Sequence, residues 1–378
     1  MSVKYKVRIF QPSVPEYRVS LFESLGEEYG HRIEIFASKE GSAGVASIPL
    51  RNMKCDYAHS FIRLGPFSWQ KRLSLEGMRK GDVLIVDGDI KQISSLYYSL
   101  CAKLLGIKVI WWGHHWSATS KMWKVFVRLQ VVKLLADVFL CYTKSGVDFL
   151  KNHGFRNRLV YATGNTIDQR PIIAAAGRWD EASLSRFRQN AGISNKTLFL
   201  VCGVLRPKMK LGLLIKALTN KKLMGQNILV AVIGDGPEKQ IYQDMAISNK
   251  VDDKFLWLGA SRDQKVLAPW FLSAVAFVYP GAIGLGILHA FSYGLPVVTH
   301  GCKDHQMPEY EAMEDGKTGV VFVEDDADDL ARKLEYAINN KKAFAQMGQY
   351  ASRKALSEYT MNSMVSNFKA AIEAAVIK

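Results

Sequence analysis

Short apolar runs alternate with helix-length segments, and this pattern occurs twice along the 378-residue chain. Such alternation predicts parallel sheets covered by helices on both faces. The first set of predicted strands lies at 6–10, 32–37, 82–88 and 108–113. The second set lies at 198–203, 228–236, 255–260, 274–280, 296–301 and 319–324. A polar, Arg-rich stretch separates the two sets, so we predict two doubly wound α/β domains.

The predicted division gives an N-terminal Rossmann-like domain at 1–175, a linker at 176–196 and a second Rossmann-like domain at 197–358. The last segment, 359–378, is too apolar to be a free tail. We expect it to form a helix that packs onto one of the domains, with the N-terminal domain as the candidate. Open parallel sheets bind ligands at the carboxyl ends of their strands, so a site is expected in a cleft where the two domains face each other.

Charge and cysteine usage narrow the possible partners and the compartment. Residues 1–190 contain 28 Lys and Arg against 16 Asp and Glu, whereas residues 191–378 contain 22 against 19. This excess favours an anionic partner such as nucleic acid, lipid or a phosphorylated substrate. No nucleic-acid-binding module is found, so nucleic acid is not expected. Five scattered cysteines, no signal peptide and no long apolar segment predict a cytoplasmic protein.

A glycine-rich stretch, YPGAIGLGILHAF at 279–291, joins a predicted strand to a short helix. Backbone N–H groups at such a junction can bind a phosphate. Its glycines fit a GxxGxG variant of the dinucleotide fingerprint, which would indicate an NAD-dependent oxidoreductase. That fingerprint normally opens a domain and is followed by an acid at the end of the next strand, where this chain has Thr299, His300 and Gly301. The dinucleotide interpretation is therefore less favoured.

In its wider context, VYPGAIGLGILHAFSYGLPVVT at 278–299 resembles the donor-site segment of the retaining, family-four glycosyltransferases of the GT-B fold. Further blocks follow in that family's order, at 161–168, 201–218, 232–243, 256–274 and 307–322. The resemblance implies an N-terminal domain that binds the acceptor and a C-terminal domain that binds a nucleotide-diphosphate sugar. It also implies sugar transfer with retention, of the type that builds bacterial surface polysaccharides such as lipopolysaccharide or capsule.

The resemblance also assigns the donor site. The leaving diphosphate must be stabilised as its negative charge grows, which backbone amides and cationic side chains can do without a metal or cofactor. We expect the amides at Ile283, Gly284 and Leu285 on one side of it. The candidate cations on the other side are Arg206, Lys208 and Lys210. The nucleotide base is expected at Gly259 and Ala260.

This chain departs from the family at its paired glutamates. The corresponding positions are Gly281 and His289, so neither carboxylate is present. A neutral imidazole can still donate to or accept from a ribose hydroxyl. We therefore expect an altered sugar preference, and a non-catalytic basic binding protein remains an alternative.

The acceptor half carries weaker signals. The resemblance places His114, or its neighbour His115, near the reacting sugar carbon. The loop after the first predicted strand supplies candidate acceptor contacts at Pro15, Glu16, Tyr17 and Arg18. Asp87-Gly88-Asp89 is a DxD, which elsewhere holds a metal-bound diphosphate. It follows a strand of the half that does not bind donor, so we interpret it as a solvated turn and expect no metal.

Two basic, aromatic stretches at 51–80 and 121–129 predict reversible binding to an anionic leaflet. The alternative is a solvated helix face over an apolar core. With a glycosyltransferase, such a surface suggests a glycan acceptor linked to polyprenyl diphosphate at the inner face of the cell membrane. The predicted membrane-facing residues are Arg63, Phe67, Trp69, Lys71, Arg72, Lys121, Lys124 and Arg128.

Overall fold

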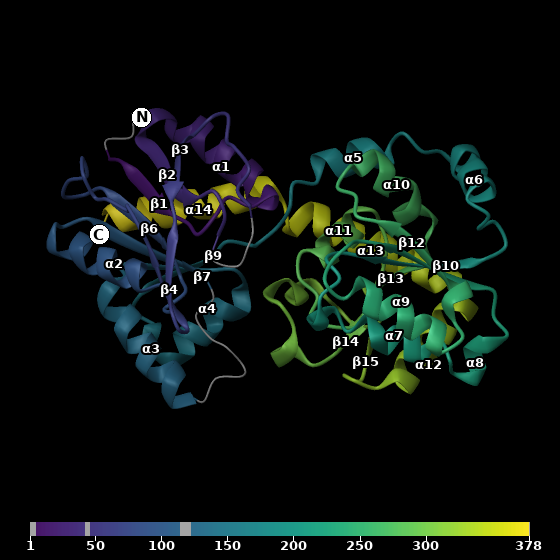
Figure 1. Ribbon diagram of the computed structural model, residues 1–378. Coiled ribbons are helices and arrows are strands. Elements are labelled where there is room, and N and C mark those ends of the chain that lie inside the picture. Colours follow the sequence, from purple (N-terminus) through teal and green to yellow (C-terminus); the bar gives the residue numbers. More distant parts are fainter. Residues whose placement is uncertain (1–4, 42–45, 114–121, 378) are drawn as a thin grey trace. The chain divides into compact units, whose positions relative to one another are not determined.

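The computed structural model describes residues 5–41, 46–113 and 122–377, and these form two compact units (Figure 1). Unit 1 contains the chain up to Thr166 together with the segment from Met361, and unit 2 runs from Ile167 to Thr360. The division thus comes earlier than the predicted domain boundary at 175. Residues predicted as a linker contribute to α5 (Arg170–Ala176) and form α6 (Glu181–Asn190), and both helices pack on α10 (Gln264–Ser273) of unit 2.

Unit 1 is built on a parallel seven-stranded sheet with the order β3-β2-β1-β6-β7-β8-β9. A separate antiparallel hairpin, β4–β5, precedes β6. The strands are β1 (Val7–Phe10), β2 (Ile33–Ser38), β3 (Lys54–His59), β4 (Phe61–Leu64), β5 (Phe67–Gln70), β6 (Val83–Asp87), β7 (Lys108–Gly113), β8 (Val138–Cys141) and β9 (Leu159–Ala162).

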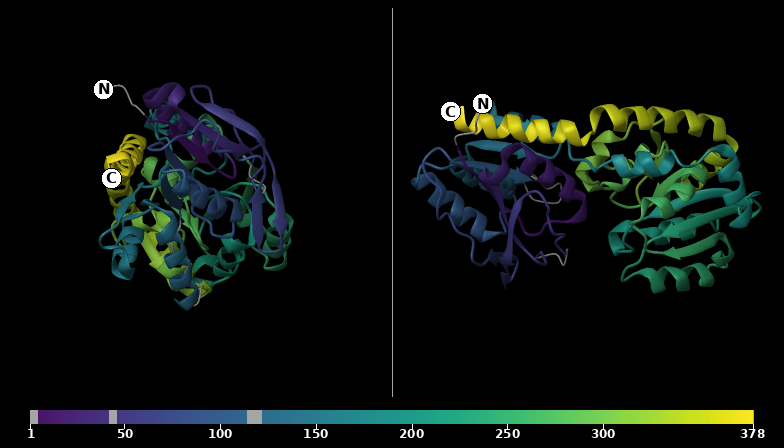
Figure 2. Two further views of the ribbon diagram at one scale, coloured as in Figure 1. Left: turned by 90° about the vertical axis from the view of Figure 1, so that its left-hand side faces the viewer. Right: turned by 90° about the horizontal axis from the view of Figure 1, so that it is seen from above.

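Helices cover the faces of this sheet, because its central strands are apolar on both sides. They are α1 (Glu16–Tyr29), α2 (Ile93–Leu104), α3 (Met122–Leu135), α4 (Lys144–Leu150) and α14 (Met361–Ile377), with short turns at η1 (Gly30–Arg32) and η2 (Lys151–Phe155). The C-terminal helix α14 runs along unit 1 (Figure 2), where the Phe368 ring meets the Trp112 ring edge-on at 4.7 Å.

Unit 2 contains a parallel six-stranded sheet with the order β12-β11-β10-β13-β14-β15. Its central strands are almost wholly buried, which matches their continuous runs of Val, Ile, Leu and Phe. The strands are β10 (Thr197–Cys202), β11 (Ile228–Ile233), β12 (Phe255–Gly259), β13 (Ala276–Tyr279), β14 (Val297–His300) and β15 (Gly319–Phe322).

The remaining elements of unit 2 pack on both faces of that sheet. The helices not yet given are α7 (Leu211–Ala217), α8 (Lys221–Met224), α9 (Lys239–Ser248), α11 (Gly286–Ser292), α12 (Ala327–Asn339) and α13 (Lys341–Glu358). Short 3-10 turns lie at η3 (Pro207–Met209), η4 (Asp252–Lys254), η5 (Lys303–His305) and η6 (Pro308–Ala312).

All ten predicted strands are confirmed, each within a few residues of its predicted bounds. In both sheets the strand order reverses beside the first strand, between β1 and β6 in unit 1 and between β10 and β13 in unit 2. The loops that leave such neighbouring strands diverge, so ligands of doubly wound sheets bind there. The carboxyl ends of β10 and β13 are therefore the first place to look for a site in unit 2.

Candidate functional site

The loops that follow β10 and β13 meet backbone to backbone. A Cβ atom on Gly281 would lie 1.9 Å from the carbonyl oxygen of Lys208, so no other residue fits without moving one loop. The N–H of Ala282 donates to that same oxygen at 3.3 Å. Position 281, where the family resemblance places a glutamate, is thus occupied by a glycine that serves close packing.

Two further glycines repeat this arrangement at the end of β11. A Cβ on Gly234 would lie 2.0 Å from the oxygen of Gly203, and one on Gly236 would lie 2.4 Å from the oxygen of Leu205. The loops after three neighbouring strands therefore converge through their main chains. This brings their backbone groups and the cations of the β10 loop to one end of the sheet.

The predicted base-binding residues lie at the same end of the sheet. Gly259 ends β12 with a φ of +75°, and its carbonyl accepts a hydrogen bond of 2.8 Å from the N–H of Gly234. Ala260 follows it and is exposed. The structure thus leaves a small, open surface at the position where the resemblance places a nucleotide base.

The glycine loop after β13 is held by a side chain that the sequence did not single out. Gln306 accepts a hydrogen bond of 2.7 Å from the N–H of Ile283 and donates to the Thr299 hydroxyl and the His300 carbonyl. This revises the prediction for Ile283, because its amide is engaged within the protein. In the described part of the chain no acceptor pairs with the N–H of Gly284 or Leu285, so these two amides remain for an anion.

The three predicted cations differ in their surroundings. Arg206 and Lys208 are exposed, and no carboxylate of the described residues lies within ion-pair distance of either. Lys210 instead contacts Glu324 at 2.9 Å and Asp325 at 2.7 Å. Arg206 and Lys208 are therefore the cations left available for a diphosphate, whereas the charge of Lys210 is already balanced.

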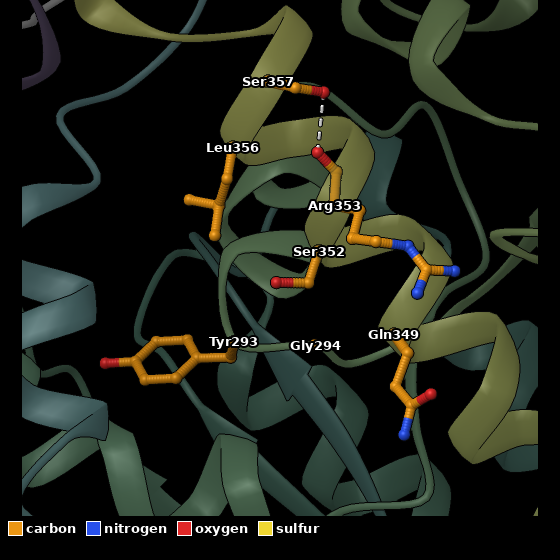
Figure 3. Close-up of a pocket in the computed structure, with 7 residues that line it drawn as sticks. All are labelled: Tyr293, Gly294, Gln349, Ser352, Arg353, Leu356 and Ser357. Carbon is orange, nitrogen blue, oxygen red and sulfur yellow. Dashed lines mark hydrogen bonds between the residues drawn. The ribbon is translucent and has the colours of Figure 1, made fainter.

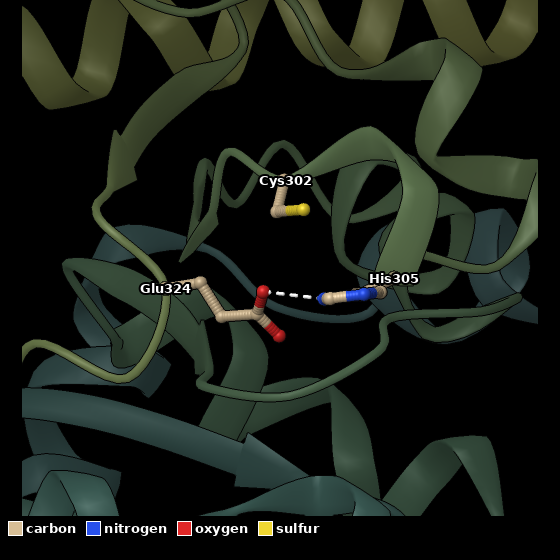
Figure 4. Close-up of side chains that lie close together, drawn as sticks. All are labelled: Cys302, His305 and Glu324. Atoms are coloured by element: carbon tan, nitrogen blue, oxygen red, sulfur yellow. Dashed lines mark hydrogen bonds and ion pairs between the residues drawn. The ribbon is translucent and has the colours of Figure 1, made fainter. Parts of the chain in front are cut away.

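Glu324 is the centre of a polar cluster just after β15. Burial alone would raise its pKa, but hydrogen bonds from Lys210 and His305 lower that pKa to about 2. The donor nitrogen Nδ1 of His305 lies 2.6 Å from Glu324 Oε2. Three possible metal ligands lie together here, namely Cys302, His305 and Glu324, and their ligand atoms are all within 4.8 Å of one another (Figure 4). Lys210 and His305 both donate hydrogen bonds to this carboxylate.

His289 lies on the inner side of the short helix α11. Burial lowers its pKa to about 4, so the ring is neutral near pH 7. Its Nε2 lies 3.0 Å from Gln264 Oε1, an oxygen that also accepts from the Tyr293 hydroxyl at 2.9 Å. Because a carbonyl oxygen only accepts, His289 must carry its proton on Nε2, which leaves Nδ1 as an acceptor. The family usually has a glutamate at this position, and Nδ1 of His289 could likewise accept a hydrogen bond from a ribose hydroxyl.

In unit 1, Arg18 and Asp87 lie at the switch point between β1 and β6. The Arg18 guanidinium is 5% exposed and lies over the rings of Trp112 and Tyr142, at 4.6 and 5.4 Å. Burial, together with Asp89, raises the pKa of Asp87 to about 7, against the opposing charge of Arg18. Asp87 is half-buried and Asp89 is exposed, so the DxD forms a turn at the end of β6 that is partly solvated.

The other predicted acceptor residues surround the start of α1. Pro15 is its N-cap residue, while Glu16 and Tyr17 are exposed in its first turn. Only Arg18 turns into the protein. His114 and His115 lie outside the described residues, so their predicted role stays a prediction.

The predicted membrane-facing residues fall on the hairpin and on α3. Arg63, Phe67, Lys71 and Arg72 are exposed, but Trp69 is half-buried with its ring 5.5 Å from that of Tyr97. Arg128 is also half-buried, and burial lowers its pKa. Neither Trp69 nor Arg128 is a free surface residue, because each packs against its neighbours. Lys121 and the side chain of Lys124 lie outside the described part.

A cavity of about 910 Å³ lies between the end of α11 and α13 (Figure 3). None of the predicted site residues lines it. Tyr293 links this cavity to the site, since its hydroxyl donates a hydrogen bond to Gln264 beside His289. The cavity is lined by Tyr293, Gly294, Gln349, Ser352, Arg353, Leu356 and Ser357.

Sequence reasoning missed the side chains that organise these loops. Gln264 and Gln306 hold His289 and the glycine loop, and Glu324 with Asp325 balances Lys210. One signal was present, since Glu324 ends the predicted strand 319–324 and Asp325 directly follows it. Polar residues at the carboxyl ends of parallel strands are candidates for a site whatever their motif.

Comparisons with known proteins agree with this geometry. Residues 185–354 match the model of the family Glycosyl transferases group 1. No curated protein matches the chain in sequence. HepE from Anabaena, solved in complex with UDP, is 13% identical with a TM-score of 0.71, covering 98% of this chain and 100% of that chain.

Two more solved structures are similar over nearly the whole chain. A glycosyltransferase from Rickettsia africae is 12% identical with a TM-score of 0.70, covering 98% of each chain. The lipopolysaccharide outer core galactosyltransferase WaaB is 16% identical with a TM-score of 0.66, covering 98% of this chain and 99% of that chain. These likenesses establish the fold, so the chain has the GT-B fold of two doubly wound domains. Within it, residues 185–354 are the part that is similar to the family Glycosyl transferases group 1.

Proposed function

We propose that this protein is a glycosyltransferase that moves a sugar from a nucleotide-diphosphate donor to a glycan acceptor with retention of anomeric configuration. The observation that carries the proposal is the convergence of the β10 and β13 loops, which gathers Arg206, Lys208 and two unpaired amides inside the matched segment. The donor complexes of HepE, which contain UDP or UDP-glucose, support a uridine nucleotide as the first donor to test.

In the proposed reaction, the bond between the sugar and the diphosphate breaks and negative charge grows on the leaving phosphate. Arg206 and Lys208 would stabilise that charge by charge-assisted hydrogen bonds. The amides of Gly284 and Leu285, at the start of α11, would add their N–H groups. His289 would accept from the ribose through Nδ1. None of these steps requires a metal, so we expect transfer to continue in EDTA.

We further propose that the acceptor is linked to polyprenyl diphosphate, that the product is a surface polysaccharide and that the enzyme binds the inner face of the cell membrane. The support comes from unit 1, where the hairpin carries exposed cations and packs against α2, and where α2 and α3 both carry exposed apolar side chains. No helix in the described ranges has the length and apolar character needed to cross a bilayer. Attachment would therefore be peripheral, through that surface.

The oxidoreductase alternative is not favoured. The helix after the glycine loop is only seven residues long, and β14 ends in His300 rather than an acid. Gly281 contacts Lys208 rather than opening toward a ligand. A purely non-catalytic role is not favoured either, because residues 185–354 match a family of transferases.

A panel of nucleotide sugars tests the proposal. Thermal shift and calorimetric titration with UDP-, GDP-, ADP- and CMP-sugars, beside NAD and NADP, should show stabilisation by one nucleotide-sugar class. Release of free nucleotide, measured with and without EDTA, then tests turnover and metal independence. Stabilisation by NAD alone, with no response to any nucleotide sugar, would overturn the proposal. Turnover lost in EDTA and restored by a divalent cation would overturn its metal-independent part.

A further inference from the structure

A second, unassigned pocket lies in unit 1, at the end of α3. It has a volume of about 470 Å³, and its walls come from the last turn of α3 and from the η2 segment with the turn that leads to β9. None of the residues predicted for donor, acceptor or membrane lines it. The lining residues are Lys133, Lys151, Asn152, Gly154, Arg156, Asn157 and Arg158.

The lining is strongly and uniformly basic. Four of its seven side chains are cationic and none is acidic. No carboxylate of the described residues lies within ion-pair distance of Lys133, Lys151, Arg156 or Arg158, although the chain has many ion pairs elsewhere. Four cations in one concave site without a counter-charge repel one another, so the site gains free energy from binding an anion. Two guanidinium groups favour a phosphate, which they can bind through paired hydrogen bonds.

The local backbone shapes this pocket. The η2 segment contains a wide helical turn interrupted at Gly154, whose φ is +91°. The carbonyl of Gly154 accepts a hydrogen bond of 2.9 Å from Lys133 Nζ, which also lies 5.4 Å from the centre of the Phe155 ring. Lys133 thus ties the turn to α3, while Lys151 and Arg156 stay exposed. The pocket is therefore held open by contacts that leave its remaining cations available.

An exposed apolar stripe on α3 leads to the same pocket. Trp123, Val127, Val131 and Leu134 follow one another at helical spacing, and their exposed fractions run from 40% at Val131 to 76% at Leu134. The stripe ends directly beside Lys133. An apolar helix face that ends next to a basic pocket has the order of a lipid, with acyl chains next to a charged headgroup.

We propose that this pocket binds the phosphate of an anionic phospholipid headgroup while the α3 stripe inserts among the acyl chains. The inference rests on the proposed membrane attachment and names the site that would make it selective for anionic lipid. A soluble phosphate ester presents the same chemistry, and the experiment below separates the two sources.

The test measures partitioning of the full-length protein onto phosphatidylcholine vesicles with and without phosphatidylglycerol. The pocket variant combines Lys151→Gln, Arg156→Gln and Arg158→Gln. The control combines Lys216→Gln, Lys221→Gln and Lys341→Gln, which remove the same charge from exposed sites of unit 2. Each cation near an anionic leaflet changes the affinity for vesicles about fivefold. The affinity of the pocket variant for vesicles with phosphatidylglycerol should therefore fall about a hundredfold, and that of the control much less. Circular dichroism and melting temperatures should match the wild type.

Each result has a defined meaning. Equal loss in both variants would show non-specific charge attraction and overturn the pocket. If the pocket variant binds vesicles as tightly as the wild type, the pocket proposal would also be overturned, but the proposed membrane attachment would stand. If millimolar glycerol 3-phosphate binds the wild type and the pocket variant keeps its vesicle binding, the pocket would be assigned to a soluble phosphate. If the pocket variant loses only the binding of an oligonucleotide, the pocket would be assigned to nucleic acid. Stabilisation by a nucleotide sugar should be the same in the wild type, the pocket variant and the control. Failure of the proposed function in the nucleotide-sugar panel can therefore be distinguished from failure of the pocket proposal.

Discussion

Replacing Gly281 by alanine tests the central feature of the site, the contact between the β10 and β13 loops. The new Cβ would meet the Lys208 oxygen at 1.9 Å, whereas ordinary contacts begin near 3.4 Å. One loop must then move by about 1.5 Å, and forcing a methyl group into a packed interior typically costs about 1–3 kcal/mol. For a unit of this size each kcal/mol lowers the melting temperature by about 2–4 °C, so a fall of about 2–12 °C is expected.

Gly225 provides a matched control in the same unit. It has a φ of −85° at the end of α8, and a Cβ there meets nothing within 4 Å. Gly225→Ala should leave the melting temperature unchanged or raise it slightly, because alanine restricts the unfolded chain. Scanning calorimetry and urea denaturation would measure both variants side by side.

The same substitution should weaken donor binding. The hydrogen bond from Ala282 to Lys208 would be lost, and the loop that carries Arg206 would shift. A Gly281→Glu variant should therefore not recover a family-like acid; it should be less stable still. If Gly281→Ala melts within a degree of Gly225→Ala and keeps the wild-type donor KM, the close approach of the loops has no energetic importance and the reasoning fails.

Three further predictions concern charges. With a pKa of about 4, His289 stays neutral above pH 5, so the donor KM should be flat from pH 5.5 to 8; a rise centred near pH 6.5 would contradict this. The pKa of Asp87 is raised from 3.8 to about 7, so its contribution to stability is full below pH 4 and lost as pH rises to 7. Asp87→Asn should flatten the dependence of melting temperature on pH in this range. An unchanged slope would disprove the assignment of that dependence to Asp87. Lys208→Gln should raise the donor KM about 10- to 100-fold with little change in melting temperature, whereas Lys210→Gln should lower stability, because it removes the ion pairs of Lys210 with Glu324 and Asp325; equal effects on KM would refute the distinction.

Much of the fold could be predicted because its central strands carry a strong local signal. Continuous apolar runs such as those of β6 and β11 are buried on both faces, and their order fixes a doubly wound topology. The edge strand β3 escaped prediction, since it is mostly polar and only partly buried. The short apolar strand β8 was also missed, because four residues between helices cannot be told from a buried helix by periodicity.

The site was less predictable because its decisive contacts join distant residues. The sequence predicted a glycine loop between a strand and a short helix, as the structure has it, but the partner of Gly281 is the main chain of Lys208, 73 positions earlier. Likewise, Lys210 pairs with Glu324 from the far edge of the sheet. A motif gives the position of a loop along the chain, whereas the charges that remain free depend on which strands lie beside it.

These contacts explain how the site can lack both usual acids and still have a defined charge balance. Two carboxylates after β15, those of Glu324 and Asp325, pair with Lys210 and balance its charge. Arg206 and Lys208 are left uncompensated, so the β10 loop has a net positive charge next to the free amides of the glycine loop. Under the proposed function, such a site would bind a diphosphate through charge and contact the sugar with backbone and neutral groups. Its sugar selectivity should therefore depend on shape more than on ionic contacts, because no carboxylate lies at Gly281 or His289 to bind hydroxyls.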